Sequence, residues 1–131
     1  MKRLYATLLS ITFAVTSVFA QQEDVMVGSL INAGDWFELE RAYPNIKDNV
    51  QTPLLKQMAE VLLAANFNRP DELRSKLPTL IAEHQSEIGF EGVCNMVVMG
   101  ATVEGFNGNY VVAADMIENI VEIIVIMQKM I

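Results

Sequence analysis

One cysteine and one histidine are the side chains in this sequence that could pair as a nucleophile and its base. Such a pair needs a third group to orient the histidine, and no motif around Cys94 or His84 supplies one. The apolar neighbours Val93 and Met96 indicate that Cys94 is a buried small residue, and we expect His84 at an exposed helix end. A single cysteine also leaves no internal disulfide. We therefore predict no catalytic residue.

Metal-ligating patterns are equally sparse. Glu118 and Glu122 stand one helical turn apart, but the polar face of a helix accounts for that spacing. No grouping of histidine, cysteine and carboxylates matches a zinc or calcium site. The sequence has no phosphate-binding glycine loop, no Gly-x-Ser-x-Gly motif and no His-Glu-x-x-His motif. We expect neither a metal nor another cofactor.

Apolar residues recur at helical spacing along most of the chain, and strand patterns are nearly absent. Thr52 followed by Pro53 is a favourable helix start, whereas Pro78 is expected to kink or divide the helix that contains it. Gly100 is explained by a neighbouring helix that packs closely against it. We predict helices over residues 25–33, 36–43, 53–65, 71–83, 86–106 and 110–129.

Short polar turns of similar sequence separate helices at three places. Gly34-Asp35-Trp36 forms the first turn and Gly108-Asn109-Tyr110 the third, and both triplets are predicted to have a structural role. The middle turn, Asn68-Arg69-Pro70, has lost its glycine. A helix pair of this kind cannot bury its apolar face alone, so the pairs must stack on one another.

These turns resemble tetratricopeptide repeats (TPRs). Gly108-Asn109-Tyr110 with Ala113 is similar to the glycine, polar, aromatic and small residues that begin the second helix of that repeat. In the first turn, Leu39 stands where the repeat usually has alanine. The resemblance implies an all-α fold of about three TPR-like antiparallel helix pairs, stacked as a short right-handed array.

A second resemblance covers most of the chain after residue 20. Residues 34–40 followed by Tyr43-Pro44, residues 67–72 and residues 84–90 look like the helical N-terminal region of secreted bacterial retropepsin-like aspartyl proteases. That family's catalytic aspartate stands in an Asp-Thr-Gly or Asp-Ser-Gly turn. None of the aspartates here (Asp24, Asp35, Asp48, Asp71 and Asp115) is followed by such a pair. The resemblance therefore implies the non-catalytic part of such a protein, and not an enzyme.

The first twenty residues are typical of a secretory signal peptide. Lys2 and Arg3 precede an apolar stretch, and Val18-Phe19-Ala20 offers a cleavage site before Gln21. We expect export to the periplasm or the extracellular space, a TPR-like helical domain over residues 21–131, and membrane contact only through an uncleaved signal.

The net charge argues against nucleic acid as a partner. Without Lys2 and Arg3, seven of the nine basic residues remain against sixteen acidic ones, and these charges are spread along the chain. An acidic surface of this kind repels phosphate backbones.

The last helix is apolar nearly all round, although the end of a repeat array normally carries a polar outer face. We predict an interaction surface there, made of Ile120, Ile124, Ile126 and Met127. It would be covered by a downstream domain, a partner protein or a second copy of the chain. The sequence thus favours an exported protein-interaction module. Two alternatives remain: a structural homodimer, and a small ligand-binding protein or enzyme with a pocket between helices near Trp36, Tyr43 and Tyr110.

Overall fold

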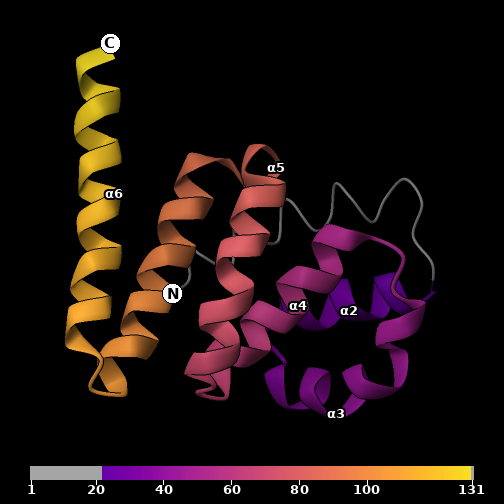
Figure 1. The fold of residues 1–131 in the computed structure, drawn as a ribbon. Helices are drawn as coiled ribbons and strands as arrows, with labels where there is room; N and C mark the ends of the chain where they lie inside the picture. The colour runs from indigo at the N-terminus through magenta and orange to yellow at the C-terminus, as the bar shows by residue number, and fades with distance from the viewer. Residues whose placement is uncertain (1–21, 131) are drawn as a thin grey trace.

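The computed structural model of the chain describes residues 22–130, with the side chains of Met127 and Met130 left out. The predicted signal peptide and its cleavage site lie outside this part. The all-helical fold is confirmed: the described residues contain no strand (Figure 1). Their helices are α2 (Gln22–Ala33), α3 (Trp36–Ile46), the 3-10 helix η1 (Lys47–Asn49), α4 (Pro53–Asn66), α5 (Pro70–Phe106) and α6 (Tyr110–Met130).

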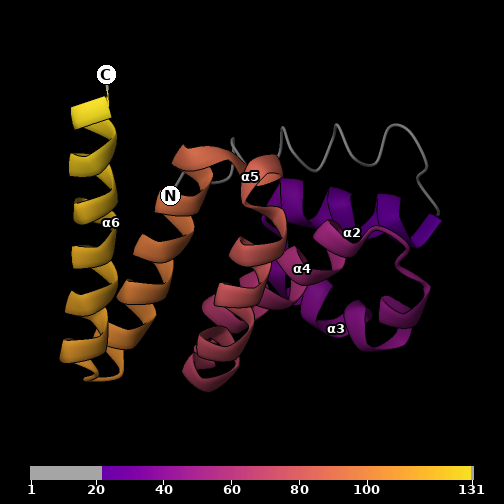
Figure 2. The same ribbon diagram turned by 45° about the horizontal axis from the view of Figure 1, so that its top comes forward.

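Helix α5 consists of two antiparallel segments. The backbone leaves the helical region at His84 (φ −130°, ψ 17°) and Gly89 (φ 80°, ψ 163°), so residues 70–83 and 90–106 run in opposite directions (Figures 1 and 2). The prediction that Pro78 divides the helix is wrong, because Pro78 keeps helical backbone angles. Its fixed φ suits a helix, and its ring lies on an exposed face.

Three turns of the same geometry join the helices into hairpins. Each contains one residue with positive φ: Gly34 (66°), Asn68 (53°) and Gly108 (79°). In each, the following N–H donates to the carbonyl five residues earlier, at 3.0 Å for Asp35, 2.8 Å for Arg69 and 2.9 Å for Asn109. Asparagine is the non-glycine residue that best tolerates a left-handed backbone. Asn68 thus replaces the glycine that the second turn lacks.

The second turn contacts the third turn and helix α3 along one edge of the molecule. The Asn107 Nδ2 of the third turn donates to Asn68 Oδ1 of the second at 2.7 Å. Arg69 Nη1 donates to Glu40 Oε2 of α3 at 3.2 Å, and its guanidinium lies over the Phe67 ring. The hairpins are therefore tied together where their helices turn.

The hydrophobic core lies where α2, α3, α4 and both segments of α5 meet. Helix α4 contributes the largest share of it, because both of its faces are covered. The largest fully buried side chains are Ile31, Leu39, Leu55, Met58, Leu62, Leu73, Leu80 and Met96. Helix α6 contributes only its inner face and lies at the outside of the bundle.

Asp24 of α2 is fully buried and anchors the start of α4. Its carboxylate accepts the backbone N–H of Gln51 at 2.8 Å, the N–H of Thr52 at 3.0 Å and the Thr52 hydroxyl at 2.6 Å. Helix α4 starts at Thr52 and Pro53 as predicted, but the Thr52 hydroxyl donates to Asp24 and makes no capping hydrogen bond. A carboxylate at a helix N-terminus is also favoured by the helix dipole.

We predict that Asp24→Ala lowers the free energy of unfolding by about 3 kcal/mol, because hydrogen bonds to a buried charged group are lost and their partly buried donors are left without that partner. Urea denaturation measures this value. The neighbouring half-buried Glu23→Ala is the control and should stay within about 0.5 kcal/mol of the unsubstituted chain. Equal losses for the two variants would show that Asp24 is not the anchor.

A matched pair of glycines tests the reversal of α5. A Cβ added at Gly89 or at Gly105 has no neighbour within 4 Å, so the two sites differ in backbone and not in space. Gly89→Ala should lower the free energy of unfolding by about 1–3 kcal/mol, since its φ and ψ are almost restricted to glycine. Gly105→Ala should leave it unchanged or raise it by up to about 1 kcal/mol. Thermal melts of both variants that agreed within error would contradict the bend.

Candidate binding groove between α5 and α6

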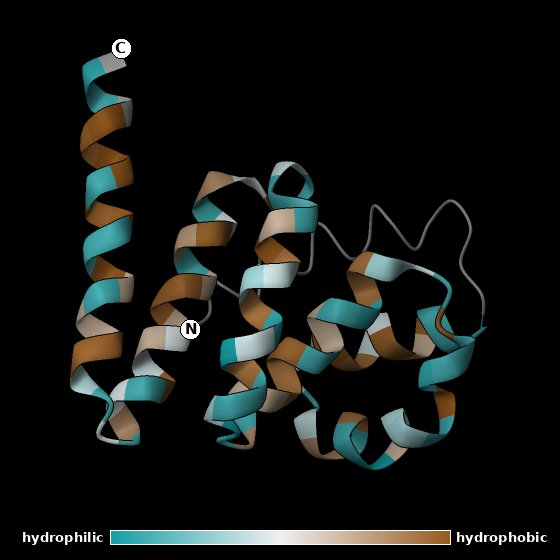
Figure 3. Ribbon diagram, viewed as in Figure 1, coloured by the Kyte–Doolittle hydropathy of each residue, from teal (hydrophilic) through white to brown (hydrophobic). Residues whose placement is uncertain are grey.

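Helix α6 packs through one face and exposes apolar residues on both sides of that face. Ile120 is buried, and Ala113, Met116 and Ile124 are half-buried at the same helical spacing. Figure 3 shows hydrophobic residues along the length of α6. The exposed large apolar residues of the helix are Tyr110, Val111, Val112, Ile117, Val121, Ile123, Val125 and Ile126.

The acidic residues of α6 form an outer stripe between two apolar flanks. Glu118 and Glu122 are four residues apart and exposed, so they share this stripe. One flank carries Ile117 and Val121, which is 52 % exposed. The other flank carries Ile123 and Ile126, which is 58 % exposed, and it borders the groove described next.

An apolar groove of about 720 Å³ lies between the first segment of α5 and α6. The second segment of α5 runs between these two walls and supplies the floor (Figure 1). Only three of the lining residues are polar: Gln85, Ser86 and Asn119. The other lining residues are Leu77, Pro78, Ile81, Ala82, Phe90, Val93, Cys94, Val97, Met116, Ile120 and Ile123. A volume of this size is usual for ligand-binding pockets.

Gly100 lets the two walls meet at one end of the groove. A Cβ at this position would lie 2.7 Å from Met116 Cε and 2.8 Å from Leu77 Cδ2. Both side chains therefore occupy the space that any other residue at position 100 would need. The prediction that a neighbouring helix packs closely on Gly100 is confirmed.

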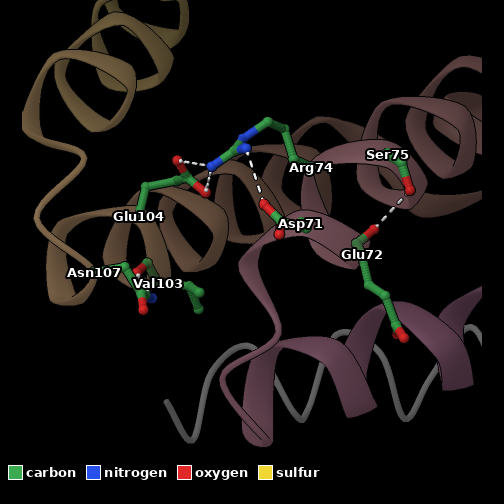
Figure 4. Close-up of polar contacts among 7 residues, drawn as sticks. All are labelled: Asp71, Glu72, Arg74, Ser75, Val103, Glu104 and Asn107. Atoms are coloured by element: carbon green, nitrogen blue, oxygen red, sulfur yellow. Dashed lines mark hydrogen bonds and ion pairs between the residues drawn. The ribbon is translucent and has the colours of Figure 1, made fainter.

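A buried carboxylate holds the two segments of α5 together near the turn edge. Glu104, in the second segment, is almost fully buried, and Arg74 Nη2 of the first segment donates to both of its oxygens at 2.8 and 2.9 Å (Figure 4). Arg74 Nη1 also donates to Asp71 at 3.2 Å. The hydrogen bond with Glu104 raises the pKa of the Arg74 guanidinium. This pair fixes one wall of the groove against its floor.

Cys94 lies in the groove and is only half-buried, contrary to the prediction that it is a buried core residue. Burial raises the pKa of its thiol, so the neutral form is favoured at neutral pH. His84 is also half-buried and not exposed as predicted. It lies at the bend, with Nδ1 2.9 Å from Glu87 Oε1. Glu87 is therefore placed to orient the His84 ring at the bend, while Cys94 lies in the groove.

The residues predicted to form one interaction surface differ in their solvent exposure. Ile126 is exposed and Ile124 half-buried, whereas Ile120 is buried against α5 and reaches only the groove. The side chain of Met127 lies outside the described residues. An exposed surface on α6 therefore consists of Ile126 and its flanking neighbours, and not of Ile120.

The turn residues take up local roles. Gly34 and Gly108 supply positive φ, and Asp35 caps α3 by accepting the Glu38 N–H at 3.2 Å. Asn109 donates the hydrogen bond that closes the third turn, and Tyr110 opens α6 with its ring exposed.

None of the three aromatic residues expected to line a pocket lies in the groove. Trp36 is half-buried against the core. Tyr43 is buried and donates its hydroxyl to the Lys56 carbonyl at 3.3 Å, and burial raises its pKa. Tyr110 is exposed.

The charges are not spread evenly, as the sequence had been taken to indicate. Between Lys76 and Lys129 there is no lysine or arginine. The acidic residues of that stretch are Glu83, Glu87, Glu91, Glu104, Asp115, Glu118 and Glu122. Glu104 is paired with Arg74, and the others are exposed. The groove therefore lies in a strongly acidic half of the molecule. The positions of lysine and arginine along the sequence were the signal from which this acidic half could have been predicted.

Two further features of residues 22–130 bear on the site. No group of three or more histidine, cysteine or carboxylate side chains among them is placed to hold a metal ion. None of the helices in this range combines the length and the apolar character needed to cross a membrane.

No protein-family model, curated protein or solved structure matches this chain. The resemblance to the N-terminal region of retropepsin-like aspartyl proteases therefore stays a prediction.

Labelling of Cys94 tests its place in the groove. We predict that maleimide reacts with Cys94 several-fold more slowly at pH 7 than with an exposed cysteine in the variant Ser29→Cys/Cys94→Ser. Access is limited, and the raised pKa lowers the fraction of thiolate. The rate should rise as the pH rises towards that pKa, and continue to rise above the ordinary range of a free thiol. Equal rates for both proteins at pH 7 would contradict this placement.

Proposed function

We propose that this protein is an exported helical-repeat module that acts by binding another protein through its C-terminal hairpin. The exposed apolar flanks of α6 are the observation that carries this proposal. A large apolar side chain left fully in water forgoes about 1.5–3 kcal/mol of burial, and these half-exposed side chains forgo part of that. Contiguous apolar patches on a soluble protein commonly mark interaction sites.

The proposed architecture is a short TPR-like array, right-handed and made of three antiparallel pairs. The three turns with the same hydrogen bond and the same positive-φ position support it. The direct contact between Asn68 and Asn107 adds a link between successive turns. In such an array each pair covers the one before it, so the last pair keeps an uncovered side.

We propose binding without catalysis, in a chain related to the helical part of a secreted aspartyl-protease-like protein. The exposed surface of α6 would then face a catalytic domain, a partner protein or a second copy. The absence of an Asp-Thr-Gly or Asp-Ser-Gly turn from the sequence supports this.

A small-molecule carrier is the second candidate, and the groove of about 720 Å³ is the observation that favours it. An apolar groove with three polar residues suits a compact apolar ligand. Native mass spectrometry of protein taken from its own source would detect such a ligand as a discrete added mass.

Two isoleucines separate binding from folding. In the absence of a partner, we expect the purified chain to self-associate, and to do so more at high salt, because salt screens the repulsion between its acidic residues. Ile126→Glu should reduce this association, measured by light scattering, and change the free energy of unfolding by less than about 0.5 kcal/mol.

Ile124→Glu is the matched control on the inner face, and should cost about 2 kcal/mol or more because a charge enters a half-buried site. A chain that stays monomeric at high concentration, with Ile126→Glu without effect, would overturn the role proposed for α6.

A further inference from the structure

We propose that the groove between the first segment of α5 and α6 receives a basic amphipathic helix of a partner protein. This inference rests on the proposed interaction role and names the class of partner.

The shape of the groove suits one face of a helix. Its wall on the helical first segment of α5 runs from Leu77 to Ala82, about 8 Å along the helix axis, and Gln85 and Ser86 extend this wall into the bend. Apolar side chains line this length, and the polar Gln85 and Ser86 lie at the end away from Leu77 and Met116. An amphipathic helix fills such a groove with residues at spacings of three, four and seven.

Carboxylates of the outer acidic stripe on α6 lie next to the groove. Asn119 lines the groove, and Asp115 and Glu122 lie four residues before it and three after it, about one helical turn away on the side of that stripe. Both are exposed, and neither forms an ion pair with another described residue. Glu87 lies in the bend, immediately after the lining residue Ser86. A lysine or arginine on the polar face of a docked helix would meet these side chains.

The same charges argue against other occupants. A second copy would bring a C-terminal hairpin with no lysine or arginine between residues 76 and 129, so like charges would face one another. A purely apolar small molecule would leave the carboxylates unused. Charge complementarity therefore selects a basic helix over both.

The test uses two labelled helical peptides with leucines at identical positions, one with lysine and the other with glutamate at all remaining positions. We expect the lysine peptide to bind the purified protein at least about tenfold more tightly at low salt, measured by fluorescence anisotropy. Added salt should weaken this binding, whereas it should promote self-association. The bound peptide should slow the maleimide labelling of Cys94 in the groove.

Two pairs of variants locate the site. Ala82→Trp fills the groove from an exposed position and should abolish binding, whereas Thr79→Trp on the same segment, outside the groove, should not. Asp115→Lys/Glu122→Lys should invert the peptide preference. The control Glu23→Lys/Asp48→Lys, with the same change in net charge on the other hairpins, should retain the preference for the lysine peptide.

Each other outcome overturns the inference in a distinct way. Equal binding of both peptides, unaffected by charge reversal, would mean that the groove takes apolar helices without regard to charge. Failure of both peptides to bind, in a protein that still self-associates through Ile126, would overturn the basic-helix partner and leave the interaction role standing. Protection of Cys94 by a neutral apolar molecule that no peptide displaces would assign the groove to a small ligand.

Discussion

The reversal of α5 at Gly89 is the constraint on which the candidate site depends. As one straight helix, the 37 residues of α5 would span about 55 Å, and α6 would lie far from the first segment. Because the backbone turns back at a conformation almost restricted to glycine, three helical segments lie side by side. The groove, the approach of Leu77 to Met116 and the pairing of Arg74 with Glu104 all follow from this arrangement.

Polar contacts hold the helical segments together at the turn edge, and apolar packing holds them together elsewhere. At the turn edge the contacts are polar and specific: the Asn107–Asn68 hydrogen bond, the Arg69–Glu40 pair and the buried Glu104 carboxylate. Away from that edge the contacts are mainly apolar. Helix α4 is covered on both faces, whereas α6 is covered on only one, so less apolar surface is buried towards the C-terminal end. The molecule therefore has a well-packed N-terminal part and an increasingly open C-terminal hairpin.

The sequence predicted the helices and the turns because their causes are local. Helical spacing of apolar residues, a proline at the start of α4 and glycine at two of the turns each act within a few residues. The prediction that Pro78 divides its helix was wrong, because a proline on an exposed helix face can keep helical backbone angles. The sequence also did not reveal that the Thr52 hydroxyl donates a hydrogen bond to Asp24, which lies in α2. The groove could not be predicted, because it depends on how three segments pack. The acidic surroundings of the groove could have been predicted, because the stretch without lysine or arginine is visible in the sequence.

The contact at Gly100 has a consequence for how the groove can diverge. The atoms nearest an added Cβ are the tips of two flexible side chains, Met116 and Leu77, and not backbone. A larger residue at position 100 would displace these tips and change the depth of the groove at that end, while the helices keep their axes. One position thus sets the length of the apolar residue that this end of the groove accepts.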